Sequence, residues 1–294
     1  MPRGINTGNN GANRRHKRST KKIIMEKVLP HTLLILFSII FIGPFLWLVS
    51  TSLKSMNEVF QLPPTLIPKS IKWDNYIKAF TRIPYMRYTI NTLAITVINV
   101  IGQVISSSLV AYSVSKINWW GKKYLFPVIV ATMMIPFQVT MIPIYIIFQK
   151  LGMVGTYWPL ILPAFGGGAF YIFLLRQFFM TIPDSLIEAA TIDGAGEVKI
   201  FFTILMPLVK PVLATVAIFT FLANWSDFMG PLLYINTKEK YTLSLGLQAF
   251  LSEHVVEWNL LMAASAIFTI PIIIIFFFAQ KQFIEGITIT GIKG

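Results

Sequence analysis

The sequence has no cysteine among its 294 residues, and only 13% of its residues are charged. The missing thiols exclude disulfide frameworks, thiolate zinc sites and cysteine nucleophiles. Soluble domains carry about 25% charged residues. This shortage of charge, with 55% hydrophobic residues and a mean hydropathy of +0.67, excludes an ordinary soluble fold. Most of the chain is expected to lie in a lipid bilayer, where charge is costly.

Motifs for nucleotide, metal and catalytic chemistry are also scarce. No G-x-x-x-x-G-K-[ST] phosphate loop occurs, so we expect the chain not to bind ATP itself. His254 and Glu257 form a lone H-x-x-E, which we interpret as surface polar residues because a metal site needs further ligands. No paired carboxylates or histidines lie within the hydrophobic segments. The sequence therefore predicts no enzyme, metal or cofactor site in this chain.

Lys and Arg are more than twice as frequent as Asp and Glu, 25 against 12. Eight of these 25 lie in residues 1–28, where Glu26 is the one acid. A polar, basic run directly before a hydrophobic segment is typical of a cytoplasmic tail attracted to anionic lipid headgroups. We therefore expect a membrane rather than a nucleic acid as the partner of this charge.

Six segments reach the length of about 20 apolar residues that a helix needs to cross a bilayer. They are Leu29–Val49, Thr89–Ser115, Tyr124–Phe148, Tyr157–Leu175, Leu205–Trp225 and Leu260–Ala279. Prolines inside them predict kinked helices. The sequence thus predicts an all-α membrane protein with six transmembrane helices. Placing both termini inside puts 16 of the 25 basic residues inside, as the positive-inside rule favours.

This reading divides the chain into five parts. They are a basic cytoplasmic tail (1–28), a first transmembrane helix (29–49), an external loop (50–88), a five-helix transmembrane domain (89–280) with a cytoplasmic loop at 181–207, and a cytoplasmic C-terminal tail (281–294).

The cytoplasmic loop is the most informative segment. Ser185 and Glu188 fit a capping box that begins a short helix, and Gly194 can end that helix in a left-handed conformation. Val198, Phe201, Phe202 and Leu205 then fall on one apolar stripe of a second helix, and Pro207 opens the fifth span. Residues 183–203 hold four acids and one lysine. An acidic helix on the side where positive charge should gather predicts a docking element for a protein partner.

The order Glu188, Ala189, Ala190, Gly194, Ile204, Met206 and Pro207 resembles the EAA loop of bacterial ATP-binding-cassette importer permeases, with Met206 in place of the usual Leu. Asp193 and Ala195, the run from Phe173 to Phe179 and the run from Asn224 to Phe228 resemble the carbohydrate subfamily, in particular the smaller, maltose-type permease subunit. Matching motifs cover nearly all of the chain after the tail. Ser226 stands where many relatives have Asn.

The resemblance implies a type I importer permease in a bacterial cell membrane, forming half of a sugar pathway. A second homologous permease would form the other half, two ATPase subunits would bind ATP-Mg, and an extracellular solute-binding protein would deliver the sugar. The EAA loop would couple to an ATPase through Glu188, Ala189, Ala190, Asp193, Gly194, Ala195 and Pro207.

Two further sets of residues are candidates for function. Polar side chains inside spans are costly in lipid, so Asn91, Asn99, Gln103, Gln138 and Asn224 are expected to face the bundle interior or the pathway. The loop from Ser226 to Trp258 is longer than a connection needs. The resemblance implies that it contacts the binding protein, with Trp225, Asp227, Tyr234 and Tyr241 as candidates.

Three alternatives remain open. An importer permease for amino acids, peptides or metals would also carry an EAA loop, although the stretches at Arg176–Phe179 and Asn224–Phe228 favour sugar. An uncoupled channel or scaffold would need no docking helix. An intramembrane enzyme would need catalytic groups that the spans lack.

Overall fold

The computed structural model describes Met25, residues 28–251 and residues 256–291, with side chains as far as Gln280. In this part of the chain the structure is helical, and Leu251 and Val256 form an isolated antiparallel bridge. Nearly all of the predicted basic tail and residues 292–294 lie outside the described residues. The chain divides into two compact units, Met1–Val49 and Ser50–Gly294.

The first unit contains one long helix, α2 (Leu29–Ser52), whose last three residues belong to the second unit. Its hydropathy is that of a membrane span, and none of its most apolar 18-residue window is buried within the fold. Pro44 lies inside this helix. A helix that is apolar all round and unburied is stable in lipid, because its backbone hydrogen bonds are satisfied internally.

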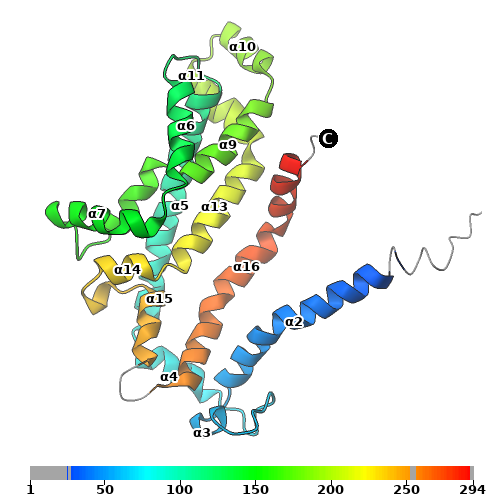
Figure 1. The fold of residues 1–294 in the computed structure, drawn as a ribbon, viewed down its shortest axis with the longest axis vertical. Helices are drawn as coiled ribbons and strands as arrows, with labels where there is room; N and C mark the ends of the chain where they lie inside the picture. The colour runs from blue at the N-terminus through cyan, green and yellow to red at the C-terminus, as the bar shows by residue number, and fades with distance from the viewer. Residues whose placement is uncertain (1–24, 26–27, 252–255, 292–294) are drawn as a thin grey trace, which may run out of the picture. The chain divides into compact units, whose positions relative to one another are not determined.

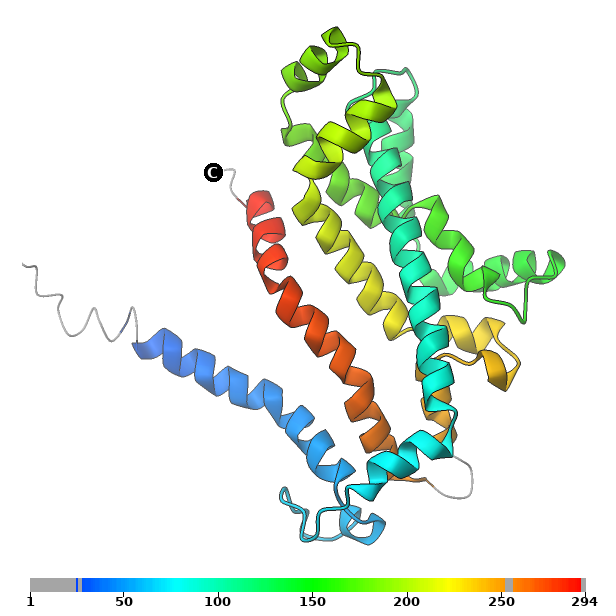
Figure 2. The same ribbon diagram turned by 180° about the vertical axis from the view of Figure 1, so that it is seen from behind.

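The second unit is built on three helices that lie side by side (Figure 1, Figure 2). They are α5 (Tyr85–Ser115), α13 (Lys210–Trp225) and α16 (Trp258–Gly291). α9 (Ala169–Thr181) packs against α5, and α6 (Lys122–Thr132) packs against both. α16 continues through residues that we expected in a C-terminal tail. We refer to the two ends of this unit as the α10 end and the α4 end (Figure 1).

Short helices connect these long ones. They are α3 (Met56–Val59), α4 (Asp74–Arg82), α7 (Phe137–Lys150), α8 (Trp158–Ile161), η2 (Leu162–Gly166), α10 (Asp184–Ile192), α11 (Glu197–Lys199), η3 (Ile200–Leu205), α12 (Met206–Leu208), α14 (Met229–Tyr234), η4 (Lys238–Lys240), α15 (Leu243–Gly246) and η5 (Leu247–Phe250).

Two predicted spans are sharply bent. The third is split into α6 and α7, which meet at 103°. Pro136 stands at this break in an extended conformation. Because a proline has no N–H to donate and disfavours helix at the residue before it, α6 does not continue through this position. By length and composition, four described helices could cross a membrane, or six if each bent pair is one span.

The fifth predicted span is bent near its start. Glu197–Leu208 and Lys210–Trp225 meet at 82°, with the bend at Val209. Leu205 and Pro207 therefore lie before the bend, and α13 begins at Lys210. Pro211 occupies the first turn of α13, where a proline costs no hydrogen bond.

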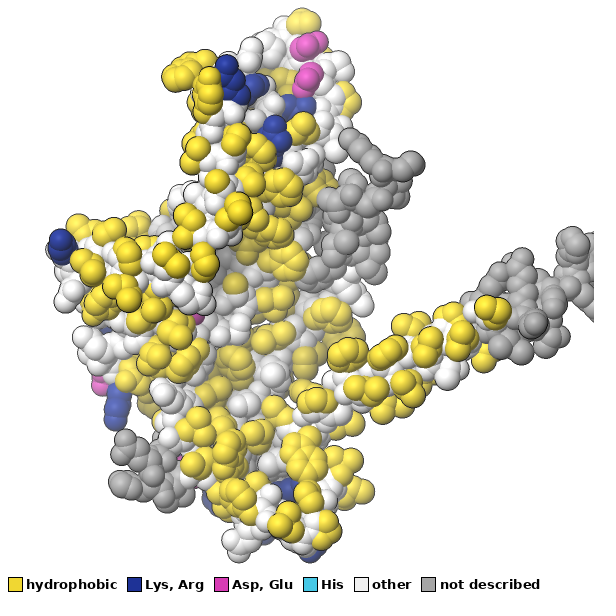
Figure 3. Space-filling view, in the orientation of Figure 1, with side chains coloured by type: hydrophobic (Ala, Val, Ile, Leu, Met, Phe, Trp, Pro, Cys, Tyr) yellow, Lys and Arg dark blue, Asp and Glu magenta, His cyan; other side chains and the backbone are white. Residues whose placement is uncertain are grey.

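Two clusters form the buried core of the second unit. The cluster at the α10 end joins α5, α9 and α13 through side chains such as Leu175, Phe179 and Val212, each fully buried. The other, at the α4 end, includes Trp225 and Phe250. Hydrophobic side chains also cover much of the outer surface, while acidic and basic side chains lie at the α10 end and also further down, toward the α4 end (Figure 3). This distribution suits helices surrounded by lipid and an end that faces water.

Candidate functional site

The helix α10 begins two residues earlier than a capping box with Ser185 as N-cap would predict. Its N-cap is Pro183, in an extended conformation and without a side-chain cap. Ser185 already lies within the first turn, so the prediction that Ser185 and Glu188 form a capping box is wrong. Asp184 holds the start of the helix in another way, by accepting a hydrogen bond of 2.6 Å from Lys116 Nζ. That bond lowers the pKa of Asp184, so the ion pair persists until the pH falls below the ordinary range of an aspartate.

The end of α10 is a glycine turn, as predicted. Gly194 has φ +78°, in the left-handed region that a residue with Cβ resists. Gly194 N–H donates to Thr191 O (3.0 Å) and Ala195 N–H donates to Ala190 O (2.9 Å). This pair of bonds is a Schellman motif, which satisfies the last carbonyls of the helix. Gly194 therefore fixes the angle at which the chain leaves α10.

The apolar stripe predicted for the following helix packs against the bundle only in part. Phe201 and Leu205 are buried, but Val198 is 72% exposed and Phe202 is 53% exposed. Val198 lies in α11, and a π-helical stretch, Ile200–Leu205, follows it. A π-helix has more residues per turn than an α-helix, so the buried face follows Ile200, Phe201 and Leu205 rather than the α-helical spacing.

The α10 end of α5 holds both arms of this loop. Lys116 Nζ also donates to Ile182 O at 2.5 Å, just before α10. One turn earlier on α5, Tyr112 OH donates to the Glu197 carboxylate at the start of the second arm. Tyr112 also packs on Phe201, with ring centroids 5.4 Å apart. Both arms of the loop are thereby bonded to the same end of α5.

The residues predicted to couple to an ATPase lie on both sides of α10. Ala190 is buried in the core cluster and Ala195 packs against it. Glu188 and Ala189 are exposed, as is Asp193 at the C-cap. Ile192, 85% exposed, lies next to Asp193 in this exposed surface. An exposed acidic and apolar surface at the water-facing end is suited to a protein partner.

Three of the five polar span residues come together in the bundle. Asn99 Nδ2 donates to Leu160 O (2.9 Å) and to Asn224 Oδ1. Asn224 Nδ2 donates to Thr220 O at 2.8 Å. Gln103, one turn along α5 from Asn99, donates to Ser107 Oγ at 3.1 Å. This polar line follows α5 through the interior and joins it to α13 and to the break after α8.

The other two polar residues lie apart from that line. Asn91 is near the α4 end, where its Nδ2 donates to Glu239 O (3.0 Å) and Tyr241 O (2.9 Å). It fastens the loop after α14 to α5. Gln138 is exposed at the break between α6 and α7.

The four candidate contacts for the binding protein differ in exposure: Trp225 and Tyr234 are buried, whereas Tyr241 lines an open groove. Trp225 is 2% exposed, donates from Nε1 to Phe268 O (3.1 Å) and stacks on Phe221 and Phe268. Tyr234 is 8% exposed and packs on Tyr145 and Phe148. Asp227 accepts a hydrogen bond from Gly230 N–H (3.1 Å), and burial raises its pKa.

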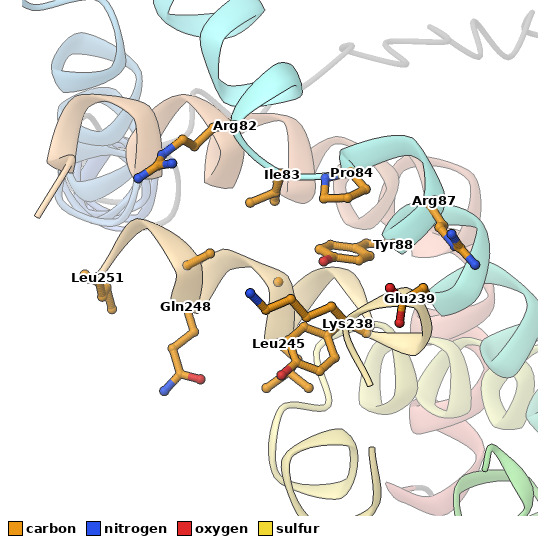
Figure 4. A pocket seen from close by; sticks show the side chains of 13 residues that line it. Arg82, Ile83, Pro84, Arg87, Tyr88, Lys238, Glu239, Leu245, Gln248 and Leu251 are labelled. Atoms are coloured by element: carbon orange, nitrogen blue, oxygen red, sulfur yellow. The ribbon is translucent and has the colours of Figure 1, made fainter. Parts of the chain in front are cut away.

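Tyr241 lines an open groove at the α4 end (Figure 4). The groove has a volume of ≈ 790 Å³ and lies between the α4–α5 junction and the loop after α14. Arg82, Arg87 and Lys238 line it, against one acid, Glu239. Arg82 Nε also bonds to Glu257 at 2.8 Å.

Tyr112, Lys116 and the two groove arginines, Arg82 and Arg87, were not among the functional residues predicted from the sequence. A signal for Arg82 and Arg87 was present, because they are basic residues in a segment assigned to the outside, where the positive-inside rule expects few. Tyr112 and Lys116 carry no comparable signal, since their partners are 85 and 68 residues away along the chain. Among the described residues no cluster of three or more His, Cys, Asp or Glu could hold a metal, and His254 lies outside them.

Comparison with known proteins gives a consistent result. Residues 103–288 match the family described as "Binding-protein-dependent transport system inner membrane component". The arabinooligosaccharides transport system permease protein AraQ of Halalkalibacterium halodurans is 34% identical over 281 residues, covering 95% of this chain and 100% of the relative. The maltodextrin transport system permease protein MdxG of Bacillus subtilis is 33% identical over 274 residues, covering 92% and 98%.

A solved structure agrees with these relatives. A chain in the crystal structure of a bacterial ABC transporter involved in the import of the acidic polysaccharide alginate has a TM-score of 0.78 and 26% identity, covering 90% of this chain and 98% of that one. Both the fold and the family match therefore extend over most of the sequence. The chain belongs to the family of binding-protein-dependent transport system inner membrane components, as a multi-pass permease subunit of a bacterial inner membrane and not itself an enzyme.

Proposed function

We propose that this chain forms half of the translocation pathway of an ATP-driven sugar importer. A second, related permease forms the other half, and an extracellular binding protein delivers the sugar. The names of the relatives support this substrate class, because they include permeases for arabinooligosaccharides, maltodextrin and galactooligosaccharides. Asn99 and Gln103 on α5 are buried, and with Asn224 on α13 their hydrogen bonds stay within the chain, so this polar line holds the half-pathway together rather than presenting free groups to the sugar.

The observation that carries the proposal is the surface of α10. It places two carboxylates, Glu188 and Asp193, beside the exposed Ile192 at a water-facing end, while Ala190 fixes the helix to the core. This helix is the docking element for one of two cytoplasmic ATPase subunits, which bind ATP-Mg. Closure of the ATPases moves α10, and the hydrogen bonds of Lys116 and Tyr112 carry that movement to α5.

At the opposite end, the groove beside Tyr241 receives the binding protein. The groove is open and its lining carries an excess of positive charge from Arg82, Arg87 and Lys238. Trp225 is buried in the cluster that also holds Tyr88 of the groove lining, and Tyr234 is buried against α7, so neither offers its ring to the binding protein in this structure.

The test is uptake by the whole complex in proteoliposomes, with this chain, its partner permease, the ATPases and the binding protein. We expect ATP-dependent accumulation of radiolabelled oligosaccharides and no accumulation of amino acids or peptides. Accumulation of amino acids or peptides instead of sugars would assign the chain to another branch of the importers. Downhill sugar flux that is independent of ATP would make it an uncoupled channel.

A further inference from the structure

A second pocket lies at the α10 end, outside the coupling loop and the polar line. It has a volume of ≈ 290 Å³ and is formed where α5 ends, α6 begins and α9 ends. We call it the basic pocket. It is lined by Val114, Ser115, Lys122, Lys123, Phe126, Pro127, Arg176 and Met180.

The charge of the basic pocket is of one sign. Lys122, Lys123 and Arg176 line it, and no carboxylate does. Among the described residues, the ion pairs of the fold use Lys78, Arg82 and Lys116 rather than these three cations. Within the same part of the chain, Lys122 Nζ donates to Ile117 O (3.0 Å) and Arg176 Nε donates to Val114 O (3.4 Å). Both partners are neutral carbonyl groups. Asp184 is close enough to interact electrostatically with Lys122, but its carboxylate is already hydrogen-bonded to Lys116, and among the described residues no ion pair neutralises Lys123 or Arg176.

Aromatic rings fix the position of these cations. The Arg176 guanidinium lies over the Phe126 ring, 4.0 Å from its centroid, and Phe126 stacks on Phe173. Lys123 Nζ lies 4.9 Å from the centroid of the Tyr124 ring. A cation–π contact holds a cation in place without neutralising its charge. The charges are therefore positioned in advance for an anion.

The surroundings of the pocket match the level of lipid headgroups. Trp120 is 83% exposed and Tyr124 is 59% exposed, and both line a hollow with Lys122 and Lys123 next to the basic pocket. Exposed Trp and Tyr at the end of a span are typical of the membrane interface. Met180, 53% exposed, adds apolar surface on the pocket side that an acyl chain can cover.

We propose that the basic pocket binds the phosphate headgroup of an anionic phospholipid of the phosphatidylglycerol type. Lys123 and Arg176 bind the phosphate, Lys122 adds charge, and the acyl chains lie against Phe126 and Met180. Lipid binding at this pocket does not depend on the transport function. The proposed function enters only in the choice of membrane leaflet, which is the one that faces the ATPases. The bound lipid would fix the start of α6 against the end of α9, next to the bond between Lys116 and Asp184.

The test is native mass spectrometry of the purified whole complex in neutral detergent, titrated with phosphatidylglycerol or phosphatidylcholine. An interfacial basic residue strengthens binding of anionic lipid about fivefold. The Lys123→Gln variant should therefore need about five times more phosphatidylglycerol for its tightest site, and the double variant Lys122→Gln/Lys123→Gln should need more still. Lys150→Gln, at the far end of α7, is the matched control and should behave as wild type.

Three results would overturn the proposal. The first is equal phosphatidylglycerol binding in wild type and the double variant. The second is a loss of phosphatidylcholine affinity in the variants as large as their loss of phosphatidylglycerol affinity. The third is displacement of the bound lipid by inorganic phosphate at millimolar concentration. The last result would identify the pocket as a site for a soluble anion. The glutamine variants keep the hydrogen-bonding capacity of exposed or half-buried side chains, and Arg176 is left intact because it packs on Phe126.

Discussion

At the scale of single residues, Gly194 is the position on which the coupling loop depends most. Its φ of +78° is needed for the two bonds that close α10, and a Cβ placed there would meet no atom within 4 Å. A substitution at Gly194 therefore acts through backbone strain alone, about 1–3 kcal/mol for a β-branched residue in this region.

We expect Gly194→Val to abolish uptake while the complex still assembles, because α10 would leave its docking angle. Gly196→Val is the matched control. Gly196 lies two residues away, has an ordinary φ of −75° and has equally open space, so its variant should retain transport. Uptake in proteoliposomes and co-purification of the ATPases give the two measurements. Equal transport in both variants would contradict the role assigned to the turn.

At the scale of elements, the π-helical stretch decides which side chains stabilise the fold. Phe201 and Leu205 are buried at 2% and 0% exposure, whereas Phe202 is half exposed. Removing a buried Leu or Phe side chain costs about 2–5 kcal/mol through lost contacts and the cavity left behind.

We predict that Leu205→Ala lowers the thermal unfolding midpoint of the detergent-solubilised complex, whereas Phe202→Ala leaves it within error. Differential scanning fluorimetry with an environment-sensitive dye measures both. A larger loss for Phe202→Ala than for Leu205→Ala would restore the α-helical register that the sequence pattern predicted.

At the scale of the whole molecule, the sequence predicted the all-helical membrane class, because charge shortage and long apolar runs are local signals. It also predicted the glycine turn at Gly194, since few residues other than glycine adopt that conformation. It predicted kinks at prolines within the spans, but neither a bend as sharp as the 103° between α6 and α7 nor the bend at Val209. A proline in a span is compatible with a mild kink or with a full break, and packing against neighbouring helices decides between them.

The contacts of Lys116 and Tyr112 with the coupling loop could not be predicted from the sequence either, because they also depend on how the helices pack. Lys116 and Tyr112 lie on α5 and read as ordinary residues at the end of a span. Their partners, Asp184 and Glu197, are brought to them only when α9 packs against α5.

Topology is a property of the whole chain and gives a separate prediction. A reporter fused after residue 120 or after residue 294 should behave as cytoplasmic, and one fused near residue 240 as external, because each bent helix pair then crosses the membrane once. Alkaline phosphatase and green fluorescent protein fusions report the two sides. A cytoplasmic signal from the fusion near residue 240 would show that one of the bent pairs does not cross.

The central claim is that α10 docks on an ATPase subunit, and disulfide cross-linking tests it most directly. The chain has no cysteine, so Ala189→Cys, on the exposed side of α10, introduces a single thiol into it. Paired with single cysteines around the cleft of an otherwise cysteine-free ATPase, it should give a cross-linked heterodimer under oxidation. Lys238→Cys, in the groove at the α4 end, should give none. Cross-linking to the ATPase from Lys238→Cys but not from Ala189→Cys would contradict the account.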